Sequence, residues 1–271
     1  MNFSVLMSIY HKEKAEYFNR AMQSIWDEQT IKPDEIILVE DGKLTDELYS
    51  VIDKWQEKLG DIFKTIPLEK NIGTGKAKNL GLQNCTFELI AIMDTDDVAH
   101  SLRFEKQLKS FKKNDIDVCS SWVSEFDNDE KNIVSYRKLP EYHNDIVKFA
   151  RKRMPVNHPA TMYKKELALG VGGYKHMMWF EDYFLMVRMM LNGARFYNIQ
   201  EPLVNMRAGY GQLERRSGLK YALNEYIFQK EILHLDFINY VEFIRNVSLR
   251  FVSRILPHGL VKIIYKNIRG K

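Results

Sequence analysis

Short apolar runs alternate with amphipathic segments through roughly the first 125 residues of the 271-residue chain. The runs at 3–9, "EIILVEDG", "IFKTIPL" and "ELIAIMDTDD" are strand-like, and helical spacing returns at 17–26, in "LYSVIDKWQEKL" and at 104–111. Continuously apolar strands are typical of a sheet that is covered on both faces. The alternation therefore predicts a doubly wound, mostly parallel α/β sheet. Ligands of such sheets bind beyond the carboxyl ends of the strands.

Acidic residues follow two of these strands. "VEDG" places Glu40 and Asp41 after the second strand, and "MDTDD" places Asp94 and Asp96 after the fourth. Because Asp94 and Asp96 are two residues apart, both carboxylates point the same way on an extended backbone. Two hard oxygen ligands suit Mg²⁺ or Mn²⁺, with a substrate diphosphate supplying further ligands. A surface turn rich in aspartate is the alternative interpretation.

The stretch "NIGTGKAKN", residues 71–79, looks at first like the phosphate loop of an ATP- or GTP-binding protein. That loop needs a glycine five residues before Gly75 and a serine or threonine after Lys76. The chain has Lys70 and Ala77 at these positions, so both requirements fail. A glycine-rich turn that opens a helix remains, and its free N–H groups favour an anion. A plain loop-to-helix junction would give the same pattern.

Glu181 and Asp182 in "WFEDYFLMVRMM" precede a helical apolar stripe. They can be acids that complement the dipole at a helix N-terminus. Alternatively, one carboxylate is a general base, and Trp179 offers an aromatic face to a sugar.

Two further segments carry candidate binding residues. His158 in "NHP" is either a satisfied polar residue or a contact to the substrate. Arg207 belongs with Arg215 and Arg216 to a basic, glycine-containing loop, "MRAGYGQLERRSG". That loop is either a solvated face or a clamp for a diphosphate.

Composition narrows the class of protein. Cys85 and Cys119 form no CxxC pair and no His cluster accompanies them, so we expect reduced residues of a cytosolic protein and no zinc site. A formal net charge of +4 is too modest to indicate a nucleic-acid partner. The N-terminus lacks a basic n-region, which predicts a first core strand and no signal peptide. No run approaches the ~20 apolar residues that span a bilayer.

After about Gly218 the pattern becomes fully helical. We therefore expect a catalytic domain at 1–217 and an amphipathic, basic helical region at 218–271. Apolar residues recur there every four positions, at Phe243, Val247, Phe251 and Ile255. Arginines lie between them. A helix in the headgroup region of a membrane fits this pattern, and anionic lipid would add ~1 kcal/mol per Lys or Arg. In the alternative, the stripe packs on the catalytic domain.

Taken in order, the elements resemble those of a family 2 glycosyltransferase with the nucleotide-sugar-binding fold called GT-A. The series is "SVLMSIYHKE", "VEDG", "NIGTGKAKNLG", "MDTDD", "NHPATMYKK" and "WFEDYFLMVRM", over roughly residues 1–215. The resemblance is strongest to bacterial transferases of O-antigen, capsule and exopolysaccharide synthesis. It implies a GT-A domain with a C-terminal helical extension, in which "NIGTGKAKN" packs beside the nucleotide.

The resemblance also implies roles for individual residues, and the donor side carries most of them. Asp41, with Glu40, matches the acid that contacts the uracil of a UDP donor, and Asp94 and Asp96 match the metal-binding pair, with Asp96 the expected direct ligand of Mn²⁺ or Mg²⁺. Lys78 stands where arginine is more usual. The remaining donor-side residues are Asn71, Gly73 and Arg207. No histidine follows Arg207 in "AGYGQ", so a third metal ligand from that loop is in doubt.

On the acceptor side, Asp182 matches the catalytic base and Glu181 is its neighbour, while Trp179 and His158 are expected to contact the acceptor. The implied reaction is inverting transfer of a hexose, galactose or glucose, from a UDP-sugar to an undecaprenyl-diphosphate-linked saccharide. The protein would work in the cytoplasm, peripherally on the inner face of the bacterial inner membrane.

Two other functions stay open at this point. A nucleotidyltransferase also pairs carboxylates with a nucleotide, but it more often begins with a glycine- and arginine-rich loop, which "SIYHKEKAEY" does not offer. A non-catalytic membrane scaffold with the same fold is the second alternative. Retention of Asp94, Asp96 and Asp182 argues against it.

Overall fold

The computed structural model describes residues 1–207 and 218–255, with side chains up to residue 250. The described chain forms two compact units by its internal contacts. The first comprises 1–176 and 181–207, and the second comprises 177–180 and the described residues from 218 onward. The short segment 177–180 thus groups with the C-terminal helices, and the predicted domains at 1–217 and 218–271 stay a prediction.

The first unit is built on a sheet that has nine strands within the described residues, in the order β3-β2-β1-β4-β8-β6-β9-β5, with β7 paired to β6. The strands are β1 (Phe3–Ile9), β2 (Glu35–Glu40), β3 (Phe63–Pro67), β4 (Leu89–Ile92), β5 (Val98–Ala99), β6 (Val118–Phe126), β7 (Ile133–Arg137), β8 (Met162–Lys164) and β9 (Phe196–Arg207). Its helices are α1 (Ala15–Ile25), α2 (Asp46–Leu59), α3 (Thr74–Asn84), α4 (Arg103–Lys113), α5 (His143–Ala150), α6 (Lys165–Gly170) and α7 (Glu181–Leu191). Two short 3-10 helices cover Gly60–Ile62 and His158–Ala160.

Strand direction confirms the predicted parallel sheet in the first half of the chain. The neighbours β3, β2, β1 and β4 are all parallel. Beyond β4 the sheet is mixed, because β8 runs antiparallel to both β4 and β6, while β6 and β9 are parallel. Because β2 and β4 run in the same direction, the acidic segments that follow them lie at the same edge of the sheet.

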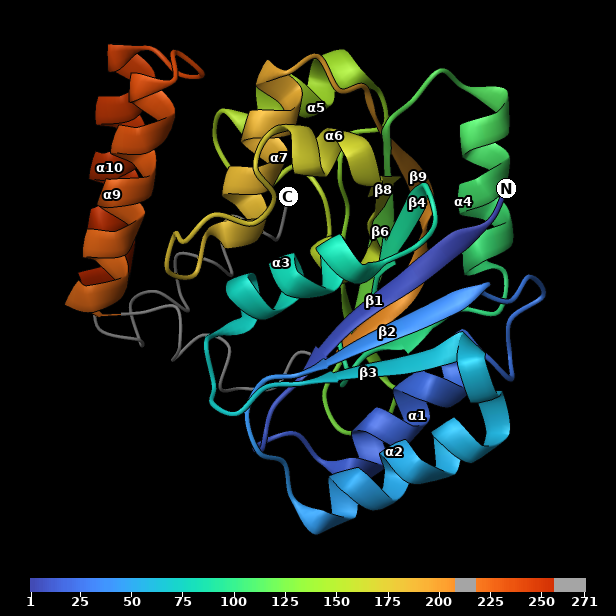
Figure 1. The fold of residues 1–271 in the computed structure, drawn as a ribbon. Helices are drawn as coiled ribbons and strands as arrows, with labels where there is room; N and C mark the ends of the chain where they lie inside the picture. The colour runs from blue at the N-terminus through green and yellow to red at the C-terminus, as the bar shows by residue number, and fades with distance from the viewer. Residues whose placement is uncertain (208–217, 256–271) are drawn as a thin grey trace. The chain divides into compact units, whose positions relative to one another are not determined.

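Helices cover both faces of the sheet, with α1 and α2 on one face and α3 on the other (Figure 1). Side chains of β1 alternate between these layers: Val5 and Met7 join the core beneath α1 and α2, and Leu6 faces α3. A Cβ atom on Gly81 would collide with Leu6 and Val39, so this glycine lets α3 approach the sheet closely. Each fully buried aliphatic side chain contributes ~1.5–3 kcal/mol to this packing.

The second unit contains the helices α9 (Leu219–His234) and α10 (Tyr240–Ile255). Asn246 on α10 donates a hydrogen bond to Gln229 on α9 (3.0 Å), and the Phe243 and Tyr226 rings lie 5.8 Å apart. The described part of the predicted apolar stripe, Phe243 and Val247, is thus half-buried. The side chains of Phe251 and Ile255, and the basic residues from 256 onward, lie outside the described residues. Among the described helices, none has the length and apolar character needed to cross a membrane.

Candidate active site

The turn after β2 and the turn before α3 fold as one structure around Asp41. The Asp41 carboxylate accepts hydrogen bonds from the backbone N–H groups of Ile72 (2.7 Å) and Gly73 (3.1 Å). The Asn71 side chain donates to the Asp41 carbonyl oxygen (3.1 Å). Gly42 has a φ of 89°, and a Cβ atom there would lie 2.8 Å from the Asn71 nitrogen, so the close approach requires glycine. The structure therefore brings the predicted donor residues Asp41, Asn71 and Gly73 together.

Glu40 is separated from this group. Its carboxyl group lies near Thr65 on β3 and Asp53 on α2. Burial, reinforced by the Asp53 charge, raises the pKa of Glu40 against the opposing hydrogen bond from Thr65. Successive side chains along a strand point to opposite faces. The two acids of "VEDG" thus have different environments, and only Asp41 contacts the turn that precedes α3.

Lys78 on α3 connects the turn before α3 to the acidic turn after β4, which contains Asp94, Asp96 and Asp97. Its Nζ atom lies 2.7 Å from Asp94 Oδ1, and only 5% of the lysine is exposed. The Asp94 side chain keeps 38% of its surface accessible, yet the surrounding protein desolvates it. Desolvation would raise the pKa of Asp94, but the Lys78 charge outweighs it and the net effect lowers the pKa. Asp94 is therefore ionised at neutral pH.

Within the described residues, the next two aspartates have no ion pair of this kind. Burial, the Asp94 charge and the Glu13 charge raise the pKa of Asp96 to about 7. Burial and the charges of Asp96 and Asp94 raise the pKa of Asp97 well above its usual range. Asp97 accepts a hydrogen bond from the Arg207 backbone N–H (2.8 Å), and Arg207 Nε donates to the Asp96 carbonyl oxygen (3.2 Å). The end of β9 is thus fixed to the acidic turn.

This acidic turn fits a divalent cation. Asp96 carries negative charge that its neighbours repel, which is the situation that a bound cation relieves. Among residues 1–207 and 218–250, no group of three His, Cys, Asp or Glu side chains forms a metal cluster. This turn therefore offers a divalent cation two carboxylate groups, those of Asp96 and the neighbouring Asp94. Mg²⁺ and Mn²⁺ are often bound in this way, with phosphate and water oxygens completing the shell.

The candidate base lies in the electrostatic neighbourhood of the same turn. Asp182 stands in the first turn of α7, and its Oδ1 accepts a hydrogen bond from the Tyr183 N–H (2.7 Å). His158 Nε2 lies 2.9 Å from Tyr174 Oη. Burial and the Lys78 charge lower the pKa of His158 to about 4, although Asp182 and Asp94 act in the opposite direction. His158 is therefore a neutral, nearly buried group within electrostatic range of both carboxylates.

Trp179 belongs to the second unit. Its ring stacks on Tyr221 of α9, with 5.1 Å between centroids and 22° between planes, and 43% of the residue is exposed. Its φ of 69° is unusual for a residue other than glycine and costs ~1–3 kcal/mol. One face of the ring is therefore occupied by Tyr221.

The residues that hold the "GVGGY" loop were not predicted from the sequence. Asn79 Oδ1 accepts a hydrogen bond from the Tyr174 N–H (2.9 Å), and a Cβ atom on Gly173 would collide with this same oxygen. Arg188 Nη2 donates to the Gly173 carbonyl oxygen (2.6 Å). Two signals were present: Asn79 closes the "NIGTGKAKN" stretch, and Arg188 is a cation within the apolar "FLMVRMM" run. The loop positions Tyr174 and, through it, His158.

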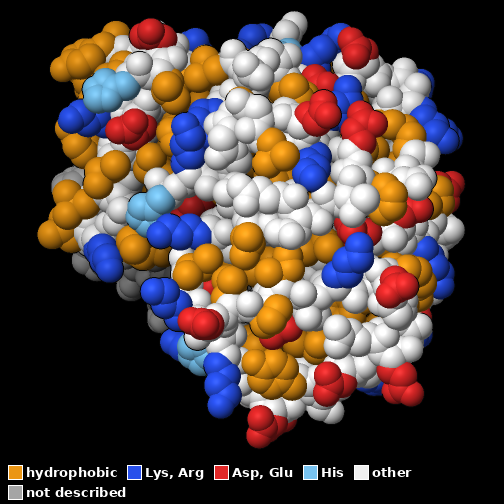
Figure 2. All heavy atoms as spheres, viewed as in Figure 1, with side chains coloured by type: hydrophobic (Ala, Val, Ile, Leu, Met, Phe, Trp, Pro, Cys, Tyr) orange, Lys and Arg blue, Asp and Glu red, His pale blue; other side chains and the backbone are white. Residues whose placement is uncertain are grey.

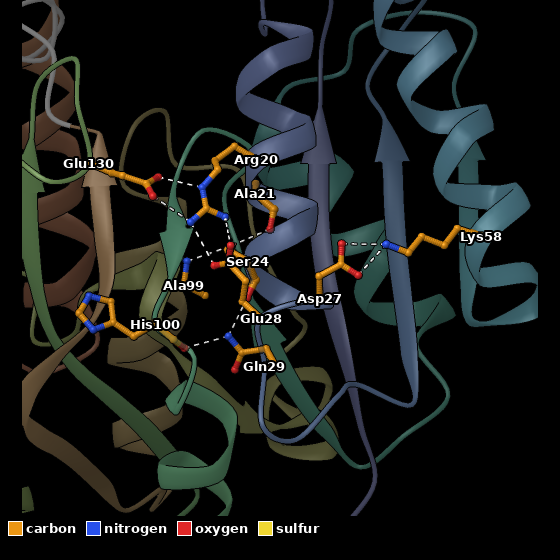
Figure 3. Close-up of polar contacts among 10 residues, drawn as sticks. All are labelled: Arg20, Ala21, Ser24, Asp27, Glu28, Gln29, Lys58, Ala99, His100 and Glu130. Carbon is orange, nitrogen blue, oxygen red and sulfur yellow. Dashed lines mark hydrogen bonds and ion pairs between the residues drawn. The ribbon is translucent and has the colours of Figure 1, made fainter.

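Helix α1 supports the segment that follows the acidic turn (Figure 3). Ser24 Oγ accepts a hydrogen bond from the Ala99 N–H (3.0 Å). Gln29 Nε2 donates to the carbonyl oxygens of Ser24 (2.7 Å) and His100 (2.8 Å). These bonds fix β5 directly after the aspartates.

Two arginines complete this support. Arg20 on α1 forms ion pairs with Glu28 and with Glu130, each at 2.9 Å (Figure 3). Arg103 is fully buried, and its Nη2 donates to the Ile92 carbonyl oxygen at the end of β4 (2.6 Å). Burial lowers the pKa of Arg103 to about 9 against the attraction of nearby aspartates. Its buried positive charge partly balances the negative charges of Asp94 and Asp97 in the acidic turn.

Comparison with known proteins places this site in a family. The model of the family "Glycosyl transferase family 2" matches residues 4–170. A "UDP-Gal:alpha-D-GlcNAc-diphosphoundecaprenol beta-1,3-galactosyltransferase" of Escherichia coli is 40% identical over 98% of this chain and 96% of its own length. "Amylovoran biosynthesis glycosyltransferase AmsE" of Erwinia amylovora is 34% identical over 98% of this chain and 99% of its own.

Solved structures agree on the fold. The chain superposes on TarS 1–349 of S. aureus in complex with UDP-GlcNAc with a TM-score of 0.68 at 18% identity, covering 94% of this chain and 72% of that one. This similarity confirms the predicted GT-A fold. By the match of more than half its length to the family model, and by relatives that align along nearly all of it, the chain belongs to glycosyl transferase family 2.

Proposed function

We propose that the protein is an inverting, metal-dependent galactosyltransferase that acts on a saccharide linked to undecaprenyl diphosphate. It would serve the synthesis of a bacterial surface polysaccharide such as O-antigen or capsule. The E. coli relative, 40% identical over nearly the whole chain, supports galactose as the sugar and the lipid-linked acceptor. The observation that carries the proposal is that α3 contacts both sides of the site. Lys78 on α3 bonds to Asp94, and Asn79 bonds to Tyr174. Tyr174 in turn contacts His158, which lies near Asp182.

The donor would lie at the carboxyl ends of β1, β2 and β4. Each oxygen of Asp41 accepts one backbone N–H, and each has a further lone pair to accept the N–H of the uracil ring. Asn71 and Gly73 would border the base. We assign no uracil contact to Glu40, because its carboxyl group lies near Thr65 and Asp53, whereas Asp41 contacts the turn before α3.

The diphosphate would lie over the acidic turn. A bound Mn²⁺ or Mg²⁺ would supply positive charge to the departing diphosphate. Asp96 would hold the cation directly, and Lys78 keeps the neighbouring Asp94 ionised. Arg207, whose backbone is fixed by Asp97, would offer its guanidinium group to the phosphate oxygens.

Transfer itself needs a proton acceptor. Asp182 would take the proton from an acceptor hydroxyl as that oxygen attacks the anomeric carbon. The bond between this carbon and the diphosphate oxygen breaks on the opposite side, so an α-linked donor gives a β-glycoside. His158, neutral at pH 7, would hydrogen-bond to the acceptor. For Trp179 the acceptor contact remains a prediction.

The second unit would place the enzyme on the cytoplasmic face of the inner membrane. Large apolar side chains on α9 and α10 are exposed, and lysines and arginines lie beside them on the visible part of these helices (Figure 2). The exposed apolar residues are Leu219, Leu223, Tyr226, Ile227, Tyr240, Val241, Ile244 and Leu249. Apolar side chains mixed with cations suit the headgroup region of an anionic bilayer.

The test is release of UDP by the purified protein with Mn²⁺ and a panel of UDP-sugars. Each donor is assayed with and without a synthetic N-acetylglucosamine-diphosphate-lipid acceptor. We expect acceptor-dependent release that is fastest with UDP-galactose and is lost when EDTA removes the metal. Faster release with another UDP-sugar would overturn the assignment of galactose. Failure to bind UDP in the presence of Mn²⁺ would favour the non-catalytic scaffold.

A further inference from the structure

Gly75 in the first turn of α3 touches Glu181, the first residue of α7. A Cβ atom built on Gly75 would lie 2.6 Å from Glu181 Cγ and 3.1 Å from Glu181 Cβ. Ordinary contacts of this kind begin at 3.4 Å, so the bare Cα of Gly75 is what allows the two residues to meet. Gly75 is buried and lies in a helix, where alanine is favoured by ~0.5–1 kcal/mol. A glycine at this position therefore has a steric reason.

The contact joins the two halves of the site. On one side, α3 carries the turn that Asp41 holds and the Lys78 that pairs with Asp94. On the other side, Glu181 directly precedes Asp182 at the start of α7. The separation between Gly75 and Glu181 thus sets how far the candidate base stands from the residues that would bind the donor.

We propose that Glu181 is a positioning residue: its side chain, packed on Gly75, sets the distance between Asp182 and the donor. The assignment rests on the proposed function, because it presumes that Asp182 is the base. The Glu181 carboxylate itself would take no proton from the acceptor. Gly75 lies in the first turn of α3, where the helix dipole favours a nearby carboxylate such as that of Glu181.

The size of the expected effect follows from the geometry. If the Glu181 side chain keeps its rotamer, restoring a 3.4 Å contact with a methyl group added to Gly75 requires a movement of about 0.8 Å. If the side chain rotates so that Cγ moves away, Cβ is still too close at 3.1 Å, and a movement of about 0.3 Å remains in addition to the change of rotamer. Displacement of a catalytic group by about 1 Å can cost ~100-fold in rate.

The experiment exchanges bulk between the two positions. We compare Gly75→Ala, Glu181→Ala and the double variant, and measure kcat, the KM for the acceptor and the Kd for UDP with Mn²⁺. Gly75→Ala should lower kcat by about tenfold or more while the Kd for UDP stays within about threefold. In the double variant the methyl group added at position 75 occupies space that the Cγ atom of residue 181 has left. Its kcat should exceed that of Gly75→Ala, so the two effects are not additive.

Two control variants separate spacing from folding and charge. Gly170→Ala adds the same methyl group to a helix glycine with nothing within 4 Å, and kcat should be unchanged. Glu181→Gln keeps the side-chain length without the charge, and it should lose less activity than Glu181→Ala. Wild-type kcat for Gly75→Ala, or a double variant whose loss equals the product of the single losses, would overturn the proposal.

Crystal structures provide a readout that does not depend on turnover. The distance between the Cα atoms of residues 75 and 182 should increase in Gly75→Ala and return in the double variant. If wild-type protein turns over no donor, the proposed function fails, but this distance still decides the positioning role. An unchanged distance in Gly75→Ala would overturn it. Should Gly75→Ala fail to fold, the same distance in Glu181→Ala, expected to shorten, decides instead.

Discussion

At the level of single residues, the ion pair between Lys78 and Asp94 determines the charge of the site. A buried lysine destabilises the folded protein unless a carboxylate balances its charge, and a carboxylate among other acids destabilises it unless a cation lies nearby. Lys78 Nζ and Asp94 Oδ1, 2.7 Å apart, balance each other's charge. Burial and neighbouring negative charges raise the pKa values of Asp96 and Asp97, and among the described side chains neither aspartate has a comparable ion pair to oppose this effect.

Replacement of Lys78 by methionine tests this interpretation. Without the cation, desolvation dominates and raises the pKa of Asp94, so part of the carboxylate is protonated nearer to neutral pH. We expect the Kd for UDP with Mn²⁺ to rise roughly 30-fold, because the loss of a charged hydrogen bond costs ~2 kcal/mol. Isothermal titration from pH 5 to 8 should show the largest loss at acidic pH. Lys78→Arg, which keeps the charge, is the control, and equal losses in both variants would contradict the account.

At the level of elements, α3 organises the site, and only part of its role could be read from the sequence. The pattern indicated a glycine-rich turn followed by a helix, and strand direction was predictable from the apolar runs. The contacts of Gly75 with Glu181 and of Asn79 with Tyr174 join segments about 100 residues apart. A local sequence pattern does not indicate which distant residue will contact Gly75 or Asn79 in the folded protein.

The mixed half of the sheet, beyond β4, could not be predicted from the sequence either. β8 is three residues long, and its pairing with β4 and β6 is decided by the packing around it. Arg103 shows the same limit. In "LRFEKQ" it reads as an ordinary helix cation, but it is fully buried beneath β4.

Glu35 links three strands and gives a stability prediction. Its carboxylate accepts hydrogen bonds from Ser4 Oγ (2.6 Å), the Thr86 N–H (2.8 Å) and Lys64 Nζ (2.9 Å). Burial acts to raise the pKa of Glu35, but these bonds outweigh it and lower the pKa from 4.5. The stabilisation is therefore present above the unfolded pKa and is lost as pH falls through the folded pKa.

We expect Glu35→Gln to reduce the free energy of unfolding at pH 7 by ~1–3 kcal/mol. The difference from wild type should narrow below about pH 4, where the wild-type carboxylate also becomes protonated. Calorimetry at both pH values measures it. A pH-independent difference would mean that the carboxylate charge contributes nothing.

At the level of the whole molecule, catalysis and membrane attachment are assigned to different units. The proposed site residues other than Trp179 lie in the first unit, and the exposed apolar side chains of α9 and α10 lie in the second. This division predicts that the two activities can be separated by mutation.

The variant Leu223→Glu/Ile227→Glu replaces two side chains that are each 49% exposed on α9. Partitioning onto vesicles that contain anionic lipid should weaken by at least about 30-fold, corresponding to ~2 kcal/mol of lost apolar burial. UDP binding should not change. Val134→Glu, an exposed apolar residue of the first unit, is the matched control. Vesicle sedimentation measures the partitioning, and equal binding by all three proteins would contradict the membrane role.

The most direct test of the central claim is a single-turnover comparison of wild type and Asp182→Asn with UDP-galactose, Mn²⁺ and the lipid-linked acceptor. The amide keeps the shape of the side chain but cannot take a proton. The account predicts a fall in the transfer rate of ~100- to 10,000-fold, with a Kd for UDP within about threefold of wild type. Transfer by Asp182→Asn at the wild-type rate would contradict the assignment of the base and, with it, the proposed mechanism.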